Sequence, residues 1–294
     1  MKNFLLYFYD LNIEKIIKKD DKYYFIYNDD QFVLENVQNI NNNIYYLNQL
    51  ILQNNIKCNE IILNKFSEPI TLYNNKYFAL MKTFKNYNKK VTFLDVLNYP
   101  IKTSYLEIEK NNDWKTVWSE KLDYLEYQIN QFGLDYPCLR ESFSYFSGIT
   151  ENAIQMLNYV LNDDLYIVHK RMKVDTTYYD LYNPFNFVLD TRVRDLAEYL
   201  KDLLINDNIY DKIDYVFKYL TNQEKELFLI RMLYPTFYFD LYENIIDKKT
   251  SENSIKKIVD QVTNYEKYLI YIMKYIDNPL LSIDWLKKVA NLLN

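Results

Sequence analysis

Only two glycines, Gly133 and Gly148, occur in the 294 residues of the chain. Glycine lets a backbone approach a bound phosphate closely, as in the glycine-rich loops of nucleotide-binding proteins. No glycine precedes Gly133, so the N-terminal part of the chain lacks the residue on which such loops depend. A phosphate-cradling loop of the usual kind is therefore not expected there.

Short runs rich in aromatic and branched residues alternate with polar turns up to about residue 84. Residues 23–27 and 31–35 read as strands, and the polar residues 28–30 between them predict a hairpin. Further strands are expected at 60–63, 70–73 and 77–81, with a turn at 74–76 and one helix over 43–54. The order predicts a small strand-rich lobe that contains a single helix.

Helical periodicity dominates beyond residue 85. We expect a helix over 114–130, one capped by Thr150, one over 194–205, one opened by a capping box at Thr221, and helices over 251–276 and 282–293. Pro235 should break or kink its helix, and residues 166–190 read as short strands and loops. The predicted domains are 1–84 and 85–294, an architecture that pattern alone leaves as one of several.

Charge and composition argue against two classes of partner. The formal net charge is −5, and Lys, Asp and Glu are mixed along the chain, so no field would attract a polyanion. Nucleic acid is therefore not an expected partner. No stretch reaches the roughly 20 apolar residues of a membrane span, so membrane insertion is not expected.

Cys58 and Cys138 are isolated and far apart in the sequence, which fits neither a metal-ligand pair nor a disulfide framework. Their use suggests a reducing compartment, and we expect a cytoplasmic protein. His169 is the only histidine, which excludes a zinc site made of several histidines.

Two segments resemble a known family. Residues 140–155 (Arg-Glu-Ser-Phe-Ser-Tyr-Phe-Ser-Gly-Ile-Thr-Glu-Asn-Ala-Ile-Gln) resemble a characteristic segment of the YutH branch of the CotS-like spore-coat proteins. Residues 192–200 (Arg-Val-Arg-Asp-Leu-Ala-Glu-Tyr-Leu) are similar to the segment after the metal-binding loop in that group and, more loosely, in aminoglycoside phosphotransferases. With the paired tryptophans Trp114 and Trp118, the resemblance covers nearly the whole chain. It implies an α+β, two-lobed protein-kinase-like fold with a small antiparallel β-rich N-terminal lobe and a larger helical C-terminal lobe.

The resemblance also shows where the chain departs from the kinase pattern. Glu35 stands where the family places the strand lysine that pairs with phosphates. In the loop that resembles His-x-Asp-x-x-x-x-Asn, His169 is retained, Arg171 replaces the aspartate and Thr176 replaces the asparagine. A guanidinium cannot accept a proton as the loop aspartate does. Counting back from the Val-Arg-Asp-Leu segment puts Asn183 at the place of the metal-binding aspartate, and an amide lacks the charge that magnesium prefers.

Other residues receive structural or residual roles. Asp195 resembles the helix-start aspartate that accepts backbone hydrogen bonds and fixes the loop. Lys170, Arg171, Asp175 and Asp190 are candidates for a residual cleft, in which Lys170 and Arg171 could clamp an anion. No metal and no cofactor are expected.

The leading hypothesis is a non-catalytic kinase-fold protein that is associated with the spore coat by resemblance. It would bind another protein, a coat or assembly protein if the organism sporulates, through the former substrate cleft or the helical lobe. The alternative is an atypical phosphotransferase acting on a small molecule or a protein, in which Asp175 or Asp190 has taken over metal binding.

Overall fold

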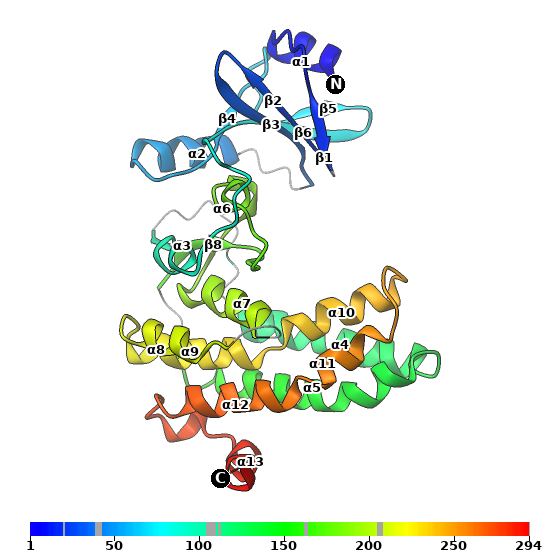
Figure 1. Cartoon of the computed structure of the whole chain (residues 1–294), viewed down its shortest axis with the longest axis vertical. Coiled ribbons are helices and arrows are strands. Elements are labelled where there is room, and N and C mark those ends of the chain that lie inside the picture. Colours follow the sequence, from blue (N-terminus) through cyan, green and yellow to red (C-terminus); the bar gives the residue numbers. More distant parts are fainter. Residues whose placement is uncertain are drawn as a thin grey trace. The chain divides into compact units, whose positions relative to one another are not determined.

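A computed structural model gives the fold of residues 1–19, 21–38, 43–103, 110, 113–161, 164–204 and 208–293. The chain divides into two compact units, which Figure 1 draws together without fixing their relative positions. Unit 1 comprises Met1–Val91, Ser104–Glu109 and Asp175–Val188, and unit 2 comprises Thr92–Thr103, Lys110–Val174 and Leu189–Asn294. The α+β prediction, with strands first and helices later, is confirmed.

The core of unit 1 is an antiparallel sheet whose strands run in the order β1-β2-β3-β6-β4, with β5 also paired to β6. The strands are β1 Ile17–Lys19, β2 Lys22–Tyr27, β3 Asp30–Asn36, β4 Glu60–Ile62, β5 Thr71–Tyr73 and β6 Lys76–Thr83. In Figure 1 they form the blue and cyan arrows beside helix α2, Ile44–Gln53. The strands expected at 23–27, 31–35, 60–63, 70–73 and 77–81 and the helix expected at 43–54 are confirmed, whereas β1 was not predicted.

The tight turns of unit 1 are made without glycine. Asn28 and Asp29 connect β2 to β3, with φ of 49° and 65°. Asn74 and Asn75 connect β5 to β6 in the same way, with φ of 49° and 60°. Positive φ at both central residues defines the hairpin turn that matches strand twist, and Asn and Asp tolerate it better than other side chains.

One face of the sheet packs against an N-terminal helix that the sequence pattern did not predict, α1 Lys2–Tyr9. Phe4 and Leu5 of α1 pack with Phe25, Phe32, Leu34, Phe78 and Leu80 of the strands. The opposite face carries the side chains that alternate with these, among them Glu35.

A distant segment of the sequence completes unit 1. Residues 175–188 contain the short helix α6, Tyr178–Leu181, and the 3₁₀ helix η1, Pro184–Asn186. Buried Asn59 joins this segment to the lobe, because its N–H donates to Tyr182 O at 2.8 Å and its Nδ2 donates to Tyr179 O at 3.0 Å.

Unit 2 is mainly helical. Its helices are α3 Phe93–Asn98, α4 Trp114–Phe132, α5 Pro137–Met156, α7 Val193–Leu203, α8 Tyr210–Phe217, α9 Asn222–Leu233, α10 Thr236–Ile246, α11 Ser254–Val259, α12 Val262–Met273 and α13 Asp284–Leu293, with the 3₁₀ helix η2 Pro279–Leu281. Helix α5 packs against α4 and α9, and α9 also packs against α12 (Figure 1). A three-stranded sheet has the order β7-β8-β9, from β7 Ile101–Lys102, β8 Tyr166–His169 and β9 Phe187–Asp190.

Two helix predictions are wrong in detail. Thr150 does not cap a helix, because α5 starts at Pro137 and runs through it, and the Thr150 hydroxyl donates to Phe146 O at 2.8 Å. The helix expected over 251–276 is two helices, α11 and α12, with Asp260 and Gln261 between them. The capping box at Thr221 and the break at Pro235 are confirmed.

Aromatic stacking fills the centre of unit 2. Trp114 lies 5.1 Å from Trp118 between ring centroids, and Trp118 lies 4.2 Å from Tyr234. Arg231 places its guanidinium over both indoles, at 4.9 and 5.4 Å. Such contacts stabilise a buried cation, so the tryptophans belong to the core.

No helix among the described residues is long and apolar enough to cross a membrane.

Candidate functional site

Glu35, which stands at the family's strand-lysine position, is the centre of a polar cluster within unit 1. Tyr179 Oη donates to Glu35 Oε2 at 2.6 Å, and Asn183 Nδ2 donates to the same oxygen at 2.7 Å. Lys22 Nζ lies 3.4 Å from Glu35 Oε1. Both carboxylate oxygens of Glu35 therefore have partners.

The Lys22 side chain reaches Glu35 from the neighbouring strand, because Lys22 and Glu35 are register partners of β2 and β3. Lys22 also pairs with Asp180 at 3.0 Å and lies over the Tyr179 ring at 4.3 Å. Burial opposes charge on Lys22, but Glu35 and Asp180 outweigh it and raise the pKa of the amine. The cation is thus neutralised by two carboxylates.

Tyr179 is the buried member of this cluster. Burial raises the pKa of its phenol well above the ordinary value, and the charge of Glu35 and the hydrogen bond to it act in the same direction. The phenol therefore stays protonated as a hydrogen-bond donor to Glu35.

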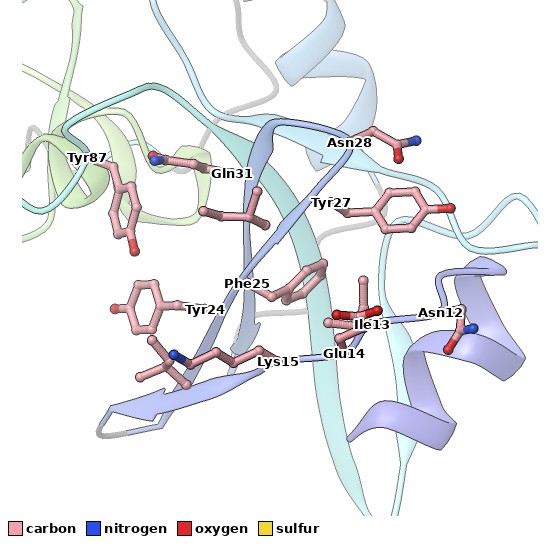
Figure 2. Close-up of a pocket in the computed structure, with 12 residues that line it drawn as sticks. Asn12, Ile13, Glu14, Lys15, Tyr24, Phe25, Tyr27, Asn28, Gln31 and Tyr87 are labelled. Carbon is pink, nitrogen blue, oxygen red and sulfur yellow. The ribbon is translucent and has the colours of Figure 1, made fainter.

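Two tyrosines stack next to the cluster. Tyr24 lies on β2 with its side chain on the Lys22 face, because residues two apart on a strand share a face. Its ring stacks on that of Tyr87 with centroids 5.5 Å apart and planes 10° apart (Figure 2). This face of the sheet therefore carries aromatic rings close to the polar groups.

The strand that precedes the Val-Arg-Asp-Leu segment ends at Asp190, not at Asn183. Asn183 precedes η1, and its Oδ1 accepts a hydrogen bond from Phe185 N at 3.0 Å. Placing Asn183 on the strand that holds the family's metal-binding aspartate is therefore wrong, and Asp190 at the end of β9 fits that description. Sequence counting failed because the segment from 175 to 186 folds as turns and short helices, whose length no periodic pattern reveals.

Asp190 has no exposed surface, and both its oxygens are engaged within unit 2. Trp114 Nε1 donates to Oδ2 at 2.9 Å, and Arg194 Nη1 donates to the same oxygen at 2.5 Å. Thr191 N donates to Oδ1 at 2.6 Å. This buried carboxylate thus has three donors, one of which is the guanidinium of its ion pair. Burial nevertheless raises the pKa of Asp190, although Arg194, Arg231 and Trp114 oppose the rise.

Asp195 and His169 form a second buried pair. His169 N donates to Asp195 Oδ1 at 2.9 Å, and His169 Nδ1 lies 2.6 Å from Asp195 Oδ2. Arg194 links the two pairs, since its Nε donates to His169 O at 2.9 Å and its Nη2 donates to Lys170 O at 3.1 Å. The retained histidine is thus held at the end of β8 by residues of α7.

Arg171 lies at the surface of unit 2 and pairs with Asp240 of α10 at 2.8 Å. Both residues line a pocket of about 240 Å³, and Lys173 lies there too. Burial raises the pKa of the Asp240 carboxyl, although Arg171 and Lys173 oppose the rise. The loop position that normally holds a base therefore holds one half of an ion pair.

The remaining predicted residues do not converge on one group of ligands. Asp175 is exposed, and Thr176 contributes its carbonyl to a hydrogen bond from Val91 N at 2.9 Å. Lys170 contributes its carbonyl to Arg194. Across the described ranges, no three of the residue types His, Cys, Asp and Glu come together in a way that could hold a metal ion.

Sequence reasoning missed the roles of Lys22, Tyr179 and Arg194, and it considered Asp180 only as a carboxylate that could replace a lost metal ligand. A cross-strand register between β2 and β3 could have suggested the Lys22–Glu35 pair, since the hairpin turn was recognised. The partners from residues 179–183 carry no comparable signal.

Comparisons with known proteins agree with this fold. A family model described as "Spore coat putative kinase YutH" matches residues 2–272. The endospore coat-associated protein YutH of Bacillus subtilis (strain 168) is 25% identical over 265 residues, which is 77% of this chain and 77% of that protein.

Solved structures show the same fold at low sequence identity. An aminoglycoside phosphotransferase from Alicyclobacillus acidocaldarius is 11% identical with a TM-score of 0.58, covering 91% of this chain and 92% of that one. Spectinomycin phosphotransferase APH(9)-Ia, solved with ADP and spectinomycin, is 10% identical with a TM-score of 0.57, covering 95% and 94%. The resemblance found in the sequence is confirmed: the chain belongs to the YutH family of kinase-like spore coat proteins.

Proposed function

We propose that this protein is a non-catalytic member of the YutH family that acts at the spore coat by binding another protein. The proposal has three parts: loss of phosphoryl transfer, retention of the fold, and use of its surface for a protein partner.

The state of Asp190 carries the proposal. Magnesium is held in phosphotransferases by carboxylate oxygens that are free to coordinate it. Asp190 sits at the end of the strand before α7, yet Arg194 and Trp114 occupy one oxygen and Thr191 N occupies the other. A metal would have to displace a buried ion pair, which is strongly unfavourable when one partner is left uncompensated.

The cluster in unit 1 supports the same conclusion independently. A lysine that pairs with phosphates needs a positive charge that no carboxylate already balances, but the charge of Lys22 is balanced by Glu35 and Asp180. The stacked Tyr24 and Tyr87 fill space on the same face. Arg171, at the position of the loop aspartate, cannot accept a proton and is paired with Asp240.

The place of action is carried over from the relative, whose name describes it as coat-associated. Reduced cysteines fit synthesis in the cytoplasm before assembly at the coat, since buried Cys58 and half-buried Cys138 are both unpaired. Binding of a protein partner requires only the surface of the fold, which remains after the residues for phosphoryl transfer are lost.

The test is a thermal-shift titration of the full chain with ATP and Mg²⁺, run beside a phosphoryl-transfer assay. Any ligand that binds the native state raises the melting temperature when its concentration is well above its Kd. We expect no shift and no transfer to spectinomycin or to casein. Stabilisation by ATP with Mg²⁺, together with transfer that is lost in Asp190→Asn, would overturn the proposal.

One observation favours a second candidate, an atypical phosphotransferase with relocated metal ligands. Asp190 is a carboxylate at the end of a strand, and rotation of Arg194 would leave Trp114 Nε1 as the remaining side-chain donor to Oδ2. This candidate requires ATP with Mg²⁺ to stabilise the wild type more than ATP alone. Equal curves for the two conditions would count against it.

A further inference from the structure

Unit 1 has a cavity of about 520 Å³ at one edge of its sheet, within the size range of ligand sites, about 300–1,000 Å³ (Figure 2). On one side lie the end of β2 and Tyr87, and on the other lies the segment that leads into β1. We call this cavity, with the adjoining edge of β2, the edge pocket. No residue of the Glu35 cluster lines it.

The edge pocket exists because β1 is shorter than β2. The last residue pair between them is Ile17 with Tyr24, whereas β2 continues to Tyr27. Hydrogen-bonding groups alternate sides along an antiparallel strand, and the two-residue turn pairs Tyr27 with Asp30 of β3. The N–H and C=O of Ile26 consequently point away from β3, and no described strand pairs with them there.

The walls of the edge pocket expose apolar side chains. Ile26 is 64% exposed and Ile17 is 56% exposed. The Tyr24–Tyr87 stack forms a flat wall beside them. Gln31 also lines the cavity, and its Oε1 is a buried acceptor without a donor among the described residues. An unpaired strand edge with apolar side chains is the surface to which extended peptides add.

The charge around the edge pocket opposes that of the whole protein, which is −5. The two bordering segments, residues 12–19 and 84–91, contain six lysines and one acidic residue, Glu14. The lysines are Lys15, Lys18, Lys19, Lys85, Lys89 and Lys90, and within the described part of the chain none of them forms an ion pair. Of these charged residues, Lys15 and Glu14 line the cavity itself. Asp29, in the turn next to the cavity, and Asp10, Asp20 and Asp21, which flank the first segment in the sequence, reduce the net charge of this region from +5 to +1. An acidic occupant is therefore favoured, and a second copy with the same lysines is disfavoured.

We propose that the edge pocket binds an acidic, extended segment of a partner protein, which adds to β2 beyond β1 and places an apolar side chain in the cavity. This deepens the proposed function, resting on its interaction part and naming the surface. A peptide is favoured over nucleic acid because it alone can use both the main-chain groups of Ile26 and the apolar wall.

The experiment measures the fluorescence anisotropy of labelled octapeptides titrated with the full chain. In three peptide sets, valine or phenylalanine alternates with aspartate, with lysine or with serine. We expect saturable binding that is tightest for the aspartate set and weakens with salt. No saturable binding, tighter binding of the lysine set, or preference for a single-stranded oligonucleotide would each overturn the proposal, as would concentration-dependent self-association that abolishes peptide binding.

Two variants separate edge pairing from charge. Ile26→Pro removes the outward N–H at an edge position where proline is tolerated, and Ile26→Val keeps it as the matched control. We expect Ile26→Pro to weaken binding about tenfold and Ile26→Val to leave it nearly unchanged. Should Ile26→Pro fail to fold, Lys15→Glu with Lys85→Glu tests the charge, against Lys256→Glu with Lys257→Glu on the exposed surface of α11.

Failure of the edge pocket and failure of the proposed non-catalytic function give different results in the peptide and ATP experiments. Peptide binding with no ATP effect supports both proposals. Peptide binding with ATP-dependent phosphoryl transfer overturns the non-catalytic function and leaves the edge pocket intact. Unchanged peptide affinity in both the proline and the glutamate variants overturns the edge pocket alone.

Discussion

Arg194 and Asp190 form an ion pair of 2.5 Å inside unit 2, four residues apart, where β9 gives way to α7. The same guanidinium donates to the carbonyls of His169 and Lys170. One side chain thus joins the strand-end carboxylate to the loop that kinases use for catalysis.

Removing this guanidinium should destabilise the protein strongly. Arg194→Met leaves Asp190 as a buried charge without its cation, so we expect the free energy of unfolding to fall by about 3–5 kcal/mol in urea denaturation. Arg194→Met with Asp190→Asn should recover part of the loss. Arg192→Met is the control, because Arg192 is more exposed and lies 3.7 Å from Glu224. Equal losses in the two single variants would contradict this account.

The Tyr179 phenol should contribute through its bond to Glu35. Tyr179→Phe removes a buried donor to a charged group, and we expect a loss of about 1.5–3 kcal/mol in the free energy of unfolding. Tyr127→Phe, at a position that is 64% exposed, should change little. A double-mutant cycle with Glu35→Gln that showed no coupling would argue against the hydrogen bond.

Acid should weaken unit 2 through Glu198. Burial alone would raise the pKa of Glu198, but Lys201, Arg231 and the Thr236 hydroxyl together hold it well below its usual range. The folded state therefore binds fewer protons than the unfolded state below the unfolded-state pKa. The ionised Glu198 therefore contributes fully to stability above the ordinary pKa of about 4.5, and this contribution is lost as the pH falls further.

The check is urea denaturation from pH 7 to pH 3. Glu198→Gln should reduce stability at pH 7 and flatten the decline with acid, because the titrating group is gone. A variant that declined as steeply as the wild type would place the acid sensitivity elsewhere.

The β2–β3 turn should favour glycine although the sequence has none there. Asp29 has a φ of 65°, which costs a side chain about 1 kcal/mol that glycine avoids. Asp29→Gly should therefore leave thermal stability unchanged or raise it slightly, whereas Asp29→Val should lower it. The reverse order of melting temperatures would contradict the turn assignment.

Local signals in the sequence predicted many of the strands and helices, whereas the two-lobed architecture came from the resemblance to the family. Runs of aromatic and branched residues on either side of a polar turn predicted β2 and β3, and a capping box predicted the start of α9. Thr150 misled because threonine caps helices but also bonds back to a carbonyl within them, and only tertiary packing tells the two apart.

The candidate site was less accessible to sequence reasoning. Position matching found Glu35, Arg171 and Asp195, whereas their partners come from elements far away in the chain. Asp240 reaches Arg171 across 69 residues, and Tyr179 reaches Glu35 across 144. Such pairs depend on tertiary folding, so neither periodicity nor spacing reveals them.

The membership of residues 175–188 in unit 1 affects how the protein can be made and divided. During synthesis Glu35 and Asn59 leave the ribosome long before Tyr179 and Asn183. The polar side chains of Glu35 and Asn59 therefore lack these partners until residues 175–188 have been made. A recombinant fragment ending at Val91 would lack that piece permanently. The N-terminal lobe is therefore a discontinuous folding unit, which no single cut in the chain can release whole.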